Sequence, residues 1–290
     1  MSKKLIDYIV ESKNAGKALG HFNFGSLEML YGIIEAGKEL NCPIIVGLSE
    51  GERNFLNGKR MADLVKNIRE QENYPIFLNA DHTHTIENAK KAIDDGFDSI
   101  VADGSKLSFE ENIKFVKEVK DYAKKVGSEI LIEGELGFIG DSSKIIDSLP
   151  DNFKENDDYM TKIDDAVEFV KQTGVDLFSP SVGTVHGMFK GGNDPQVSIK
   201  RVEEISNSVS CPLVLHGGSG TKDDVLAEAV KSGIAVVHIS TELRVAFKDG
   251  LIVGLGRDEN EITPSKYMTD SITLVKDLVF KKLKIFGWGL

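Results

Sequence analysis

The segment NADHTHT at residues 79–85 carries an acid, two imidazoles and several amide or hydroxyl groups at the end of an apolar run. The whole chain has six histidines, namely His21, His82, His84, His186, His216 and His238. Neutral imidazoles combined with carboxylates, and without thiolates, are typical ligands of a catalytic zinc ion that keeps one coordination position open. These residue types predict a catalytic zinc site, provided that the fold gathers the histidines in one place.

Carboxylates accompany the histidines. Asp81 precedes His82 directly, Asp103 lies in ADGS, and Glu133 and Glu135 lie in IEGELG. Because side chains alternate along a strand, Glu133 and Glu135 share one face and point together, either into the site or away from it. A salt bridge or a helix-cap acceptor is an equally good interpretation of Glu133. An acid next to a proposed metal ligand, such as Asp81, is expected to reach the substrate or the outer sphere of the metal.

The elements that must position these residues are short apolar runs, each followed by an amphipathic stretch. Eight runs occupy residues 17–24, 43–50, 75–82, 98–105, 129–136, 176–183, 212–219 and 235–242. Continuous rather than alternating apolar strands, alternating with helices, are typical of a parallel sheet covered on its outside. We predict a single-domain α/β fold over residues 1–290, a (β/α)8 TIM barrel, with a doubly wound open sheet as the alternative. The polar segment at about residues 138–160 is expected to be a mobile loop.

Every histidine falls at or just past the end of one of these runs, so a barrel would bring them to one face. Three glycine-rich or hydroxyl-rich endings, GTVHGMFKGG, HGGSG and HISTE, lie on the same side. Their exposed backbone N–H groups are suited to grip a phosphate, and Lys190 adds a positive charge nearby.

Composition limits the partners of the chain. The formal net charge of -11 argues against nucleic acid as the main partner, while local groups can still bind an anionic substrate. No apolar stretch is long enough to span a membrane or to form a signal peptide, so we expect no membrane partner. The two cysteines, Cys42 and Cys211, each precede a proline at the start of an apolar run, which predicts buried thiols and a cytoplasmic location.

The residues now on the page resemble the metal-dependent class II fructose-bisphosphate and tagatose-bisphosphate aldolases over nearly the whole length, from GHFNFGSLE through FLNADHTHTIENAKKAIDDGF, IEGELGFIG and VGTVHGMFKGG to HGGSG and HISTEL. The resemblance implies that His82, His186 and His216 hold zinc, and that Asp81 exchanges a proton with the C4 hydroxyl. Asp103 and Glu135 match positions near the metal, Glu135 at an alternative metal position. The positions that hold the ketose and its phosphate are matched by Ser49, Gly187, Lys190, Gly217, Ser219, Ser240 and Thr241.

The chemistry of an aldol cleavage agrees with this set of residues. Breaking a carbon–carbon bond beta to a ketone leaves an enediolate, which a zinc ion can stabilise as a Lewis acid. A positioned base must remove the C4 hydroxyl proton, the role assigned to Asp81. The interior of the predicted barrel offers no obvious lysine for a Schiff base. A second divalent ion or a monovalent cation is left open beside zinc, and the resemblance implies a homodimer or homotetramer.

Three positions depart from the pattern of the family. His238 stands where the family usually carries an asparagine that helps to stabilise the enediolate, so we assign it a catalytic role. The loop glutamate that handles the proton at C3 is replaced by Ser143, and Asp141 is the nearest acid to take over that task. Arg53 is our candidate for the far phosphate in place of an arginine late in the chain, with a solvated helix-start charge as the alternative.

Several functions follow as alternatives. The leading prediction is reversible cleavage of fructose 1,6-bisphosphate, a phosphorylated ketose. The same chemistry on tagatose 1,6-bisphosphate or another ketose phosphate is the nearest alternative, because the epimers differ at one hydroxyl. A metal-dependent sugar phosphate isomerase or epimerase is a second class, and a non-catalytic phosphosugar-binding protein is a third. His84 matches no ligand position and is interpreted as polar lining.

Overall fold

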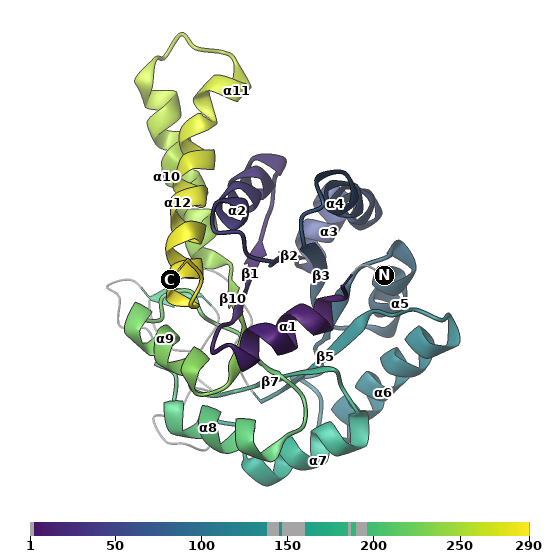
Figure 1. Cartoon of the computed structure of the whole chain (residues 1–290). Helices are drawn as coiled ribbons and strands as arrows, with labels where there is room; N and C mark the ends of the chain where they lie inside the picture. Colours follow the sequence, from purple (N-terminus) through teal and green to yellow (C-terminus); the bar gives the residue numbers. More distant parts are fainter. Residues whose placement is uncertain (1–2, 138–144, 147–159, 185–186, 190–195, 290) are drawn as a thin grey trace.

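The computed structural model describes residues 3–137, 145–146, 160–184, 187–189 and 196–289. Eight parallel strands close into a barrel in the order β1-β10-β9-β7-β5-β4-β3-β2 (Figure 1). The barrel strands are β1 Leu19–Asn23, β2 Ile44–Leu48, β3 Ile76–Thr83, β4 Ser99–Ala102, β5 Leu131–Leu136, β7 Leu177–Pro180, β9 Leu213–Leu215 and β10 Ile234–Ile239. The predicted barrel is therefore confirmed, and the open sheet is wrong. The predicted mobile loop lies almost entirely outside the described residues.

Helices cover the outside of the barrel and meet the strands in a continuous apolar core. The helices of the described residues are α1 Leu5–Asn14, α2 Leu27–Glu39, α3 Glu50–Leu56, α4 Gly58–Glu72, α5 Ile86–Asp95, α6 Phe109–Lys125, α7 Ile163–Thr173, α8 Ile199–Ser208, α9 Asp223–Lys231, α10 Thr241–Arg257, α11 Pro264–Tyr267 and α12 Thr269–Ile285. Two short strands, β6 Ile145–Ile146 and β8 Met188–Phe189, pair outside the barrel.

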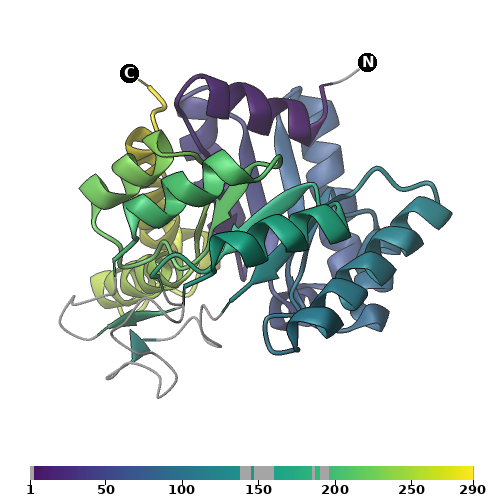
Figure 2. The same cartoon turned by 90° about the horizontal axis from the view of Figure 1, so that it is seen from below.

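Helix α1 closes the end of the barrel at which the strands begin (Figure 2). Leu5 and Ile9 of α1 are buried against a second apolar cluster inside the barrel, which includes Ile45, Phe77 and Val236. Side chains thus fill the lower barrel, as in a packed core rather than a pore. The opposite end, where the strands finish, is left for polar residues.

Helices α10 and α12 run side by side and extend beyond the barrel, with α11 at the far tip (Figure 1). Val275, Val279 and Leu283 of α12 are fully buried within this chain. These three residues form an apolar stripe along α12 that packs within this chain. Gly254 of α10 permits the close approach of the hairpin, because a Cβ there would overlap the carbonyl oxygen of Tyr267.

Two further expectations are tested by the described residues. Cys42 and Cys211 are both buried and free, as their position before apolar strands predicted. Burial raises the pKa of the Cys42 thiol to about 12, so this group is a packing residue rather than a nucleophile. None of the described helices combines the length and the apolar character needed to cross a membrane.

Candidate active site

Asp81 and His82 face the same site because strand β3 is irregular where they lie. The register between β3 and β4 shifts between Ala80 and Thr83, and His82 has a positive φ of 41°. In a regular strand two adjacent side chains point to opposite faces, whereas a bulge re-aims one of them. A left-handed backbone is costly for a residue with a Cβ, and such strain is concentrated at functional sites.

Two imidazole nitrogens face each other across the end of the barrel. His82 Nε2 lies 3.2 Å from His216 Nδ1. The other nitrogen of each ring contacts a carboxylate: His82 Nδ1 is 2.8 Å from Asp103, and His216 Nε2 is 2.7 Å from Glu133. A carboxylate accepts a hydrogen bond from the ring N–H that faces it. In the neutral rings, Asp103 and Glu133 therefore favour the tautomers in which His82 Nε2 and His216 Nδ1 carry the lone pairs.

This arrangement fits a zinc ion. Two nitrogens bound to tetrahedral zinc are about 3.4 Å apart, close to the separation of the two lone pairs. Asp81, His82 and His216 offer ligand atoms within 4.8 Å of one another, and so do His82, Asp103 and Glu135. Glu135 Oε2 is buried and lacks a hydrogen-bond partner among the described residues. His186, the third predicted ligand, lies outside the described residues.

The pKa values of these groups follow from their burial and charges. Burial lowers the pKa of His216 to about 3, helped by the charge of His82, so its ring is neutral at neutral pH. Burial also opposes protonation of His82, but Asp81, Asp103 and Glu135 outweigh it and raise that pKa to about 10. Burial raises the pKa of Glu133 to about 7 and holds that of Glu135 well above its usual value. A metal cation would replace the proton that this acidic cluster attracts to His82.

The two oxygens of Asp81 have different surroundings. Oδ2 accepts a hydrogen bond of 2.9 Å from Asn23 Nδ2. Oδ1 is buried and makes no hydrogen bond within the described part of the chain; it lies 3.4 Å from His238 Nδ1 and 3.8 Å from His82 Nε2. Burial acts to raise the pKa of Asp81, but the positive charge of His82, followed by the contact with His238, holds it well below its usual value. Asp81 is therefore an ionised base whose Oδ1 is the oxygen left for the reaction.

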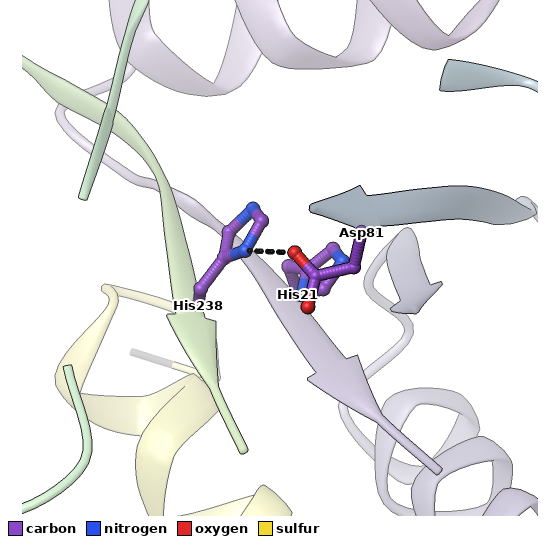
Figure 3. A group of neighbouring side chains, drawn as sticks. All are labelled: His21, Asp81 and His238. Atoms are coloured by element: carbon purple, nitrogen blue, oxygen red, sulfur yellow. Dashed lines mark ion pairs between the residues drawn. The ribbon is translucent and has the colours of Figure 1, made fainter. Parts of the chain in front are cut away.

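His21, His238 and Asp81 come together from β1, β10 and β3 (Figure 3). The rings of His21 and His238 stack with centroids 3.5 Å apart and an interplanar angle of 6°. His21 Nε2 is 3.2 Å from Asn79 Oδ1, and Asn79 in turn donates to Ser99. Burial lowers the pKa of His21 to about 3 and that of His238 to about 4, so two neutral rings form the stack. His21 thereby fixes the ring that faces Asp81.

Gly47 of β2 makes room for this stack, because a Cβ there would overlap the His21 ring. We expect Gly47→Ala to lower the free energy of unfolding by about 2 kcal/mol, the cost of overpacking a core. In a His21→Ala background the same change should cost clearly less, since the ring it would overlap is gone. Urea denaturation of the four proteins measures both costs. An equal cost in both backgrounds would show that Gly47 does not serve His21.

A pocket opens beside Asp81 and His82. Its lining comprises Asn23, Asp81, His82, Gly187, Gly217, Gly218, Ser219, His238, Ser240 and Thr241. Helix α10 begins at Thr241, so the positive end of its dipole lies at this pocket. Ser240 precedes the helix without using its hydroxyl as a cap, and its Oγ is buried without a partner among the described residues. These groups can bind an anion.

A sequence model described as "Fructose-bisphosphate aldolase class-II" matches residues 3–288. The chain belongs to this family. Fructose-bisphosphate aldolase from Staphylococcus aureus is 33% identical over 284 residues, 97% of this chain and 96% of that protein. The Geobacillus stearothermophilus fructose-bisphosphate aldolase is 32% identical over 273 residues, 93% and 91% of the two chains. The structure of the YdjI aldolase from Escherichia coli K12 has a TM-score of 0.82 at 28% identity, covering 99% of this chain and 98% of that one.

The protein is therefore a class II aldolase, a carbon–carbon lyase. The family depends on zinc, and the cluster of His82, His216 and buried carboxylates can hold such an ion. Family membership also implies a sugar phosphate as the substrate. Membership of this family gives no support to the two alternative functions, a sugar phosphate isomerase or epimerase and a non-catalytic binding protein.

Most of the residues that the sequence pointed to gather at this end of the aldolase, but Arg53 and Ser49 do not line the pocket. The side chain of Arg53 is 10% exposed and donates to the backbone oxygens of Leu48 and Asp81, and it lines a separate pocket with Glu50 and Asn88. Ser49 caps α3 and donates its hydroxyl to Glu52. His84 is 43% exposed and lies 3.4 Å from Asp103, at the rim of the metal cluster. Asp141 and Lys190 lie outside the described residues.

Sequence reasoning missed Asn23 and Glu52 of the aldolase site. Asn23 holds Asp81, and its Nδ2 also lies 3.3 Å from Glu52 Oε2. Glu52 accepts further hydrogen bonds from Ser49 and from Arg244 Nη2, the latter at 2.8 Å. The signal for Asn23 was its polar side chain near the end of the first apolar run. Glu52 gave no such signal, because an acid in the first turn of a helix is usually a capping residue.

Proposed function

We propose that this aldolase reversibly cleaves fructose 1,6-bisphosphate to dihydroxyacetone phosphate and glyceraldehyde 3-phosphate, with zinc as its metal. The observation that carries the proposal is the ionised Asp81 carboxylate: its Oδ1 makes no hydrogen bond to any described residue and lies 3.8 Å from His82 Nε2, and Asp81 lines the pocket that can bind an anion. The full-length relatives that bear the name fructose-bisphosphate aldolase support the choice of sugar.

Asp81 and its neighbours account for the proton that moves during cleavage. Asp81 Oδ1 takes the proton of the C4 hydroxyl, the C4–O bond becomes a carbonyl, and the C3–C4 bond breaks. Asn23 holds Oδ2, so the carboxylate cannot turn away from the substrate. Zinc, when bound, supplies Lewis-acid stabilisation of the negative charge that remains on the ketose half. His82 and His216 of this chain, with His186, are the proposed ligands.

One phosphate of the substrate is proposed to bind at the pocket side formed by β9, β10 and α10. Gly217 and Gly218 place backbone groups in the lining of the proposed anion site, and Gly217 has the positive φ of 69° that such a turn requires. Ser219, Ser240 and Thr241 add hydroxyl groups. The far phosphate is the less supported part, because Arg53 is already bound to backbone oxygens.

His238 is proposed to fill the place of the usual asparagine. We expect His238→Asn to retain zinc and to keep kcat/KM within about tenfold of the wild type, because an amide offers a donor and an acceptor at a similar position. Zinc analysis and steady-state kinetics check this. A loss beyond about a hundredfold with zinc retained would assign the imidazole a task that an amide cannot perform.

The sugar is tested by assaying fructose 1,6-bisphosphate and tagatose 1,6-bisphosphate side by side with the zinc-loaded aldolase. The released triose phosphate is reduced enzymatically and followed by absorbance. We expect kcat/KM for the fructose epimer to be at least about tenfold higher, since one misplaced hydroxyl leaves a polar partner unpaired. A preference for tagatose would reassign the substrate, and cleavage of neither would point to another ketose phosphate.

Several expectations stay predictions. Asp141 as the base that handles the C3 proton, Lys190 at the phosphate, Glu135 at an alternative metal position, and a second divalent or monovalent cation are part of the proposed function. The homodimer or homotetramer and the cytoplasmic location belong with them. Measurement of the native mass would distinguish the homodimer from the homotetramer.

A further inference from the structure

Lys282 of α12 is a buried lysine that touches no reacting group. Its side chain is 4% exposed, and Nζ lies 3.1 and 3.0 Å from the two oxygens of Glu242 and 3.5 Å from Asp223. Burying an ammonium ion is unfavourable unless it is paired and hydrogen-bonded. Helix packing at this position would be served equally by an apolar side chain, so the charge calls for another explanation.

Glu242 connects this lysine to the loop after β9. It is the second residue of α10, and its Oε1 accepts a hydrogen bond of 2.8 Å from the backbone N–H of Gly220. The link is reinforced by Ser219, whose Oγ accepts from the backbone N–H groups of Ser240, at 3.2 Å, and Glu242, at 3.4 Å. Hydrogen bonds thus join the loop after β9 to the start of α10. Lys282 of α12 binds the Glu242 carboxylate that takes part in this connection.

These tied segments are the ones that line the anion side of the pocket. Gly217, Gly218 and Ser219 belong to the loop, and Ser240 and Thr241 directly precede Glu242. A carboxylate one residue from this lining would repel a phosphate if it were left unpaired. The ammonium group of Lys282 neutralises Glu242 and holds its Oε1 on Gly220.

We propose that Lys282 is a positioning residue for phosphate binding. It acts through Glu242, which it neutralises and fixes, so that the loop after β9 and the N-terminus of α10 keep the spacing that a phosphate needs. The inference rests on the proposed placement of a substrate phosphate at these two segments. It assigns no contact between Lys282 and the substrate.

The test compares Lys282→Met with Lys281→Met in the zinc-loaded enzyme. Lys281 is the matched control, because it is 63% exposed and pairs with Asp223 at 2.7 Å. We expect K282M to raise both KM for fructose 1,6-bisphosphate and Kd for dihydroxyacetone phosphate about tenfold, with kcat and zinc content unchanged, as for loss of uniform binding. K281M should match the wild type in every one of these measurements. Equal values for K282M and K281M would overturn the proposal.

Glu242→Gln provides the second variant and completes a double-mutant cycle. The amide still accepts from Gly220 but loses the charge that Lys282 holds, so we expect a KM increase of about threefold. In K282M/E242Q no unpaired carboxylate is left, and KM should return to the E242Q value instead of rising about thirtyfold. A KM in the double variant equal to the product of the two single effects would overturn the proposal. If K282M does not fold, an unchanged KM in both E242Q and the neutral double variant would overturn it.

Binding of dihydroxyacetone phosphate to the zinc-loaded wild type, followed by calorimetry, separates the two proposals. If the wild type does not bind this ligand, the proposed function fails, and Lys282 loses its stated purpose with it. If the wild type binds it and K282M binds it equally well, only the inference about Lys282 fails.

Discussion

Asp81→Asn is expected to lower kcat by about 10³-fold and to leave the zinc content unchanged. The asparagine keeps the shape of the side chain and can still contact Asn23, but its amide cannot take the proton of a hydroxyl group. The effect should therefore appear in kcat, because the proton moves only during the reaction. Steady-state cleavage kinetics and elemental analysis of the purified variant measure the two quantities.

A matched control for this variant is Asp94→Asn, which changes an exposed acid that accepts from Tyr122 on the surface. It should retain the wild-type kcat. Retention of kcat within tenfold in D81N would contradict the role of Asp81 as the base. Loss of zinc in D81N would make this residue a metal ligand, in line with its place in a cluster with His82 and His216.

His216→Ala is expected to yield a folded protein that contains no zinc and has lost at least about 10³-fold in kcat/KM. His216 Nδ1 is one of the two facing lone pairs, and an alanine leaves His82 without that partner. Zinc at about 1,000 times its Kd should stabilise the wild type by about 4 kcal/mol and give H216A no comparable gain. Thermal unfolding with and without zinc measures the difference.

Glu133→Gln is expected to have an intermediate effect on zinc binding. Glu133 accepts from His216 Nε2 and orients the ring, so its amide variant should bind zinc about 10- to 100-fold more weakly without abolishing binding. The order of affinities is then wild type, E133Q, H216A. Zinc binding by H216A at the wild-type affinity would show that the ion lies elsewhere in the protein.

The barrel could be predicted from the sequence because its strands are buried on both faces. Runs such as PIIVGLSE are continuous and apolar, and their alternation with amphipathic helices leaves few other folds. The ends of the strands were predicted less well. The run at 98–105 gives a strand of only four residues, Ser99–Ala102, because the residues that follow, 103–105, leave the ladder, and Asp103 joins the site.

The sequence predicted the parts of the candidate site in which the residue type alone indicates a chemical role. It did not predict the parts in which the role of a residue depends on its contacts in the fold. His82 and Asp81 were recognised, but a regular strand would have turned one of them away, and only the bulge in β3 lets both face the pocket. His21 was identified in the sequence, but no role could be assigned to it. Its stacking on His238 depends on the space left by Gly47 on a different strand. The charge of Arg53 suggested a ligand, yet its guanidinium is used by backbone oxygens.

Burial of one lysine among several is likewise a property of the folded helix. The last helix carries Lys281, Lys282 and Lys284 within four positions, and the sequence alone gives them similar weight. The phase of α12 against α10 places Lys282 inside, with 4% of its side chain exposed, and Lys281 outside, with 63% exposed. The phase depends on packing contacts that composition and periodicity do not specify.

The most direct test of the account is to locate the metal by anomalous diffraction at the zinc absorption edge in crystals of the zinc-loaded enzyme. We predict a single strong peak between His82 and His216, with His82 Nε2 and His216 Nδ1 each about 2.1 Å from the ion. His82 Nδ1 should remain on Asp103, and His216 Nε2 on Glu133. A peak bound through the opposite ring nitrogens, or one away from both histidines, would contradict the site described for this aldolase.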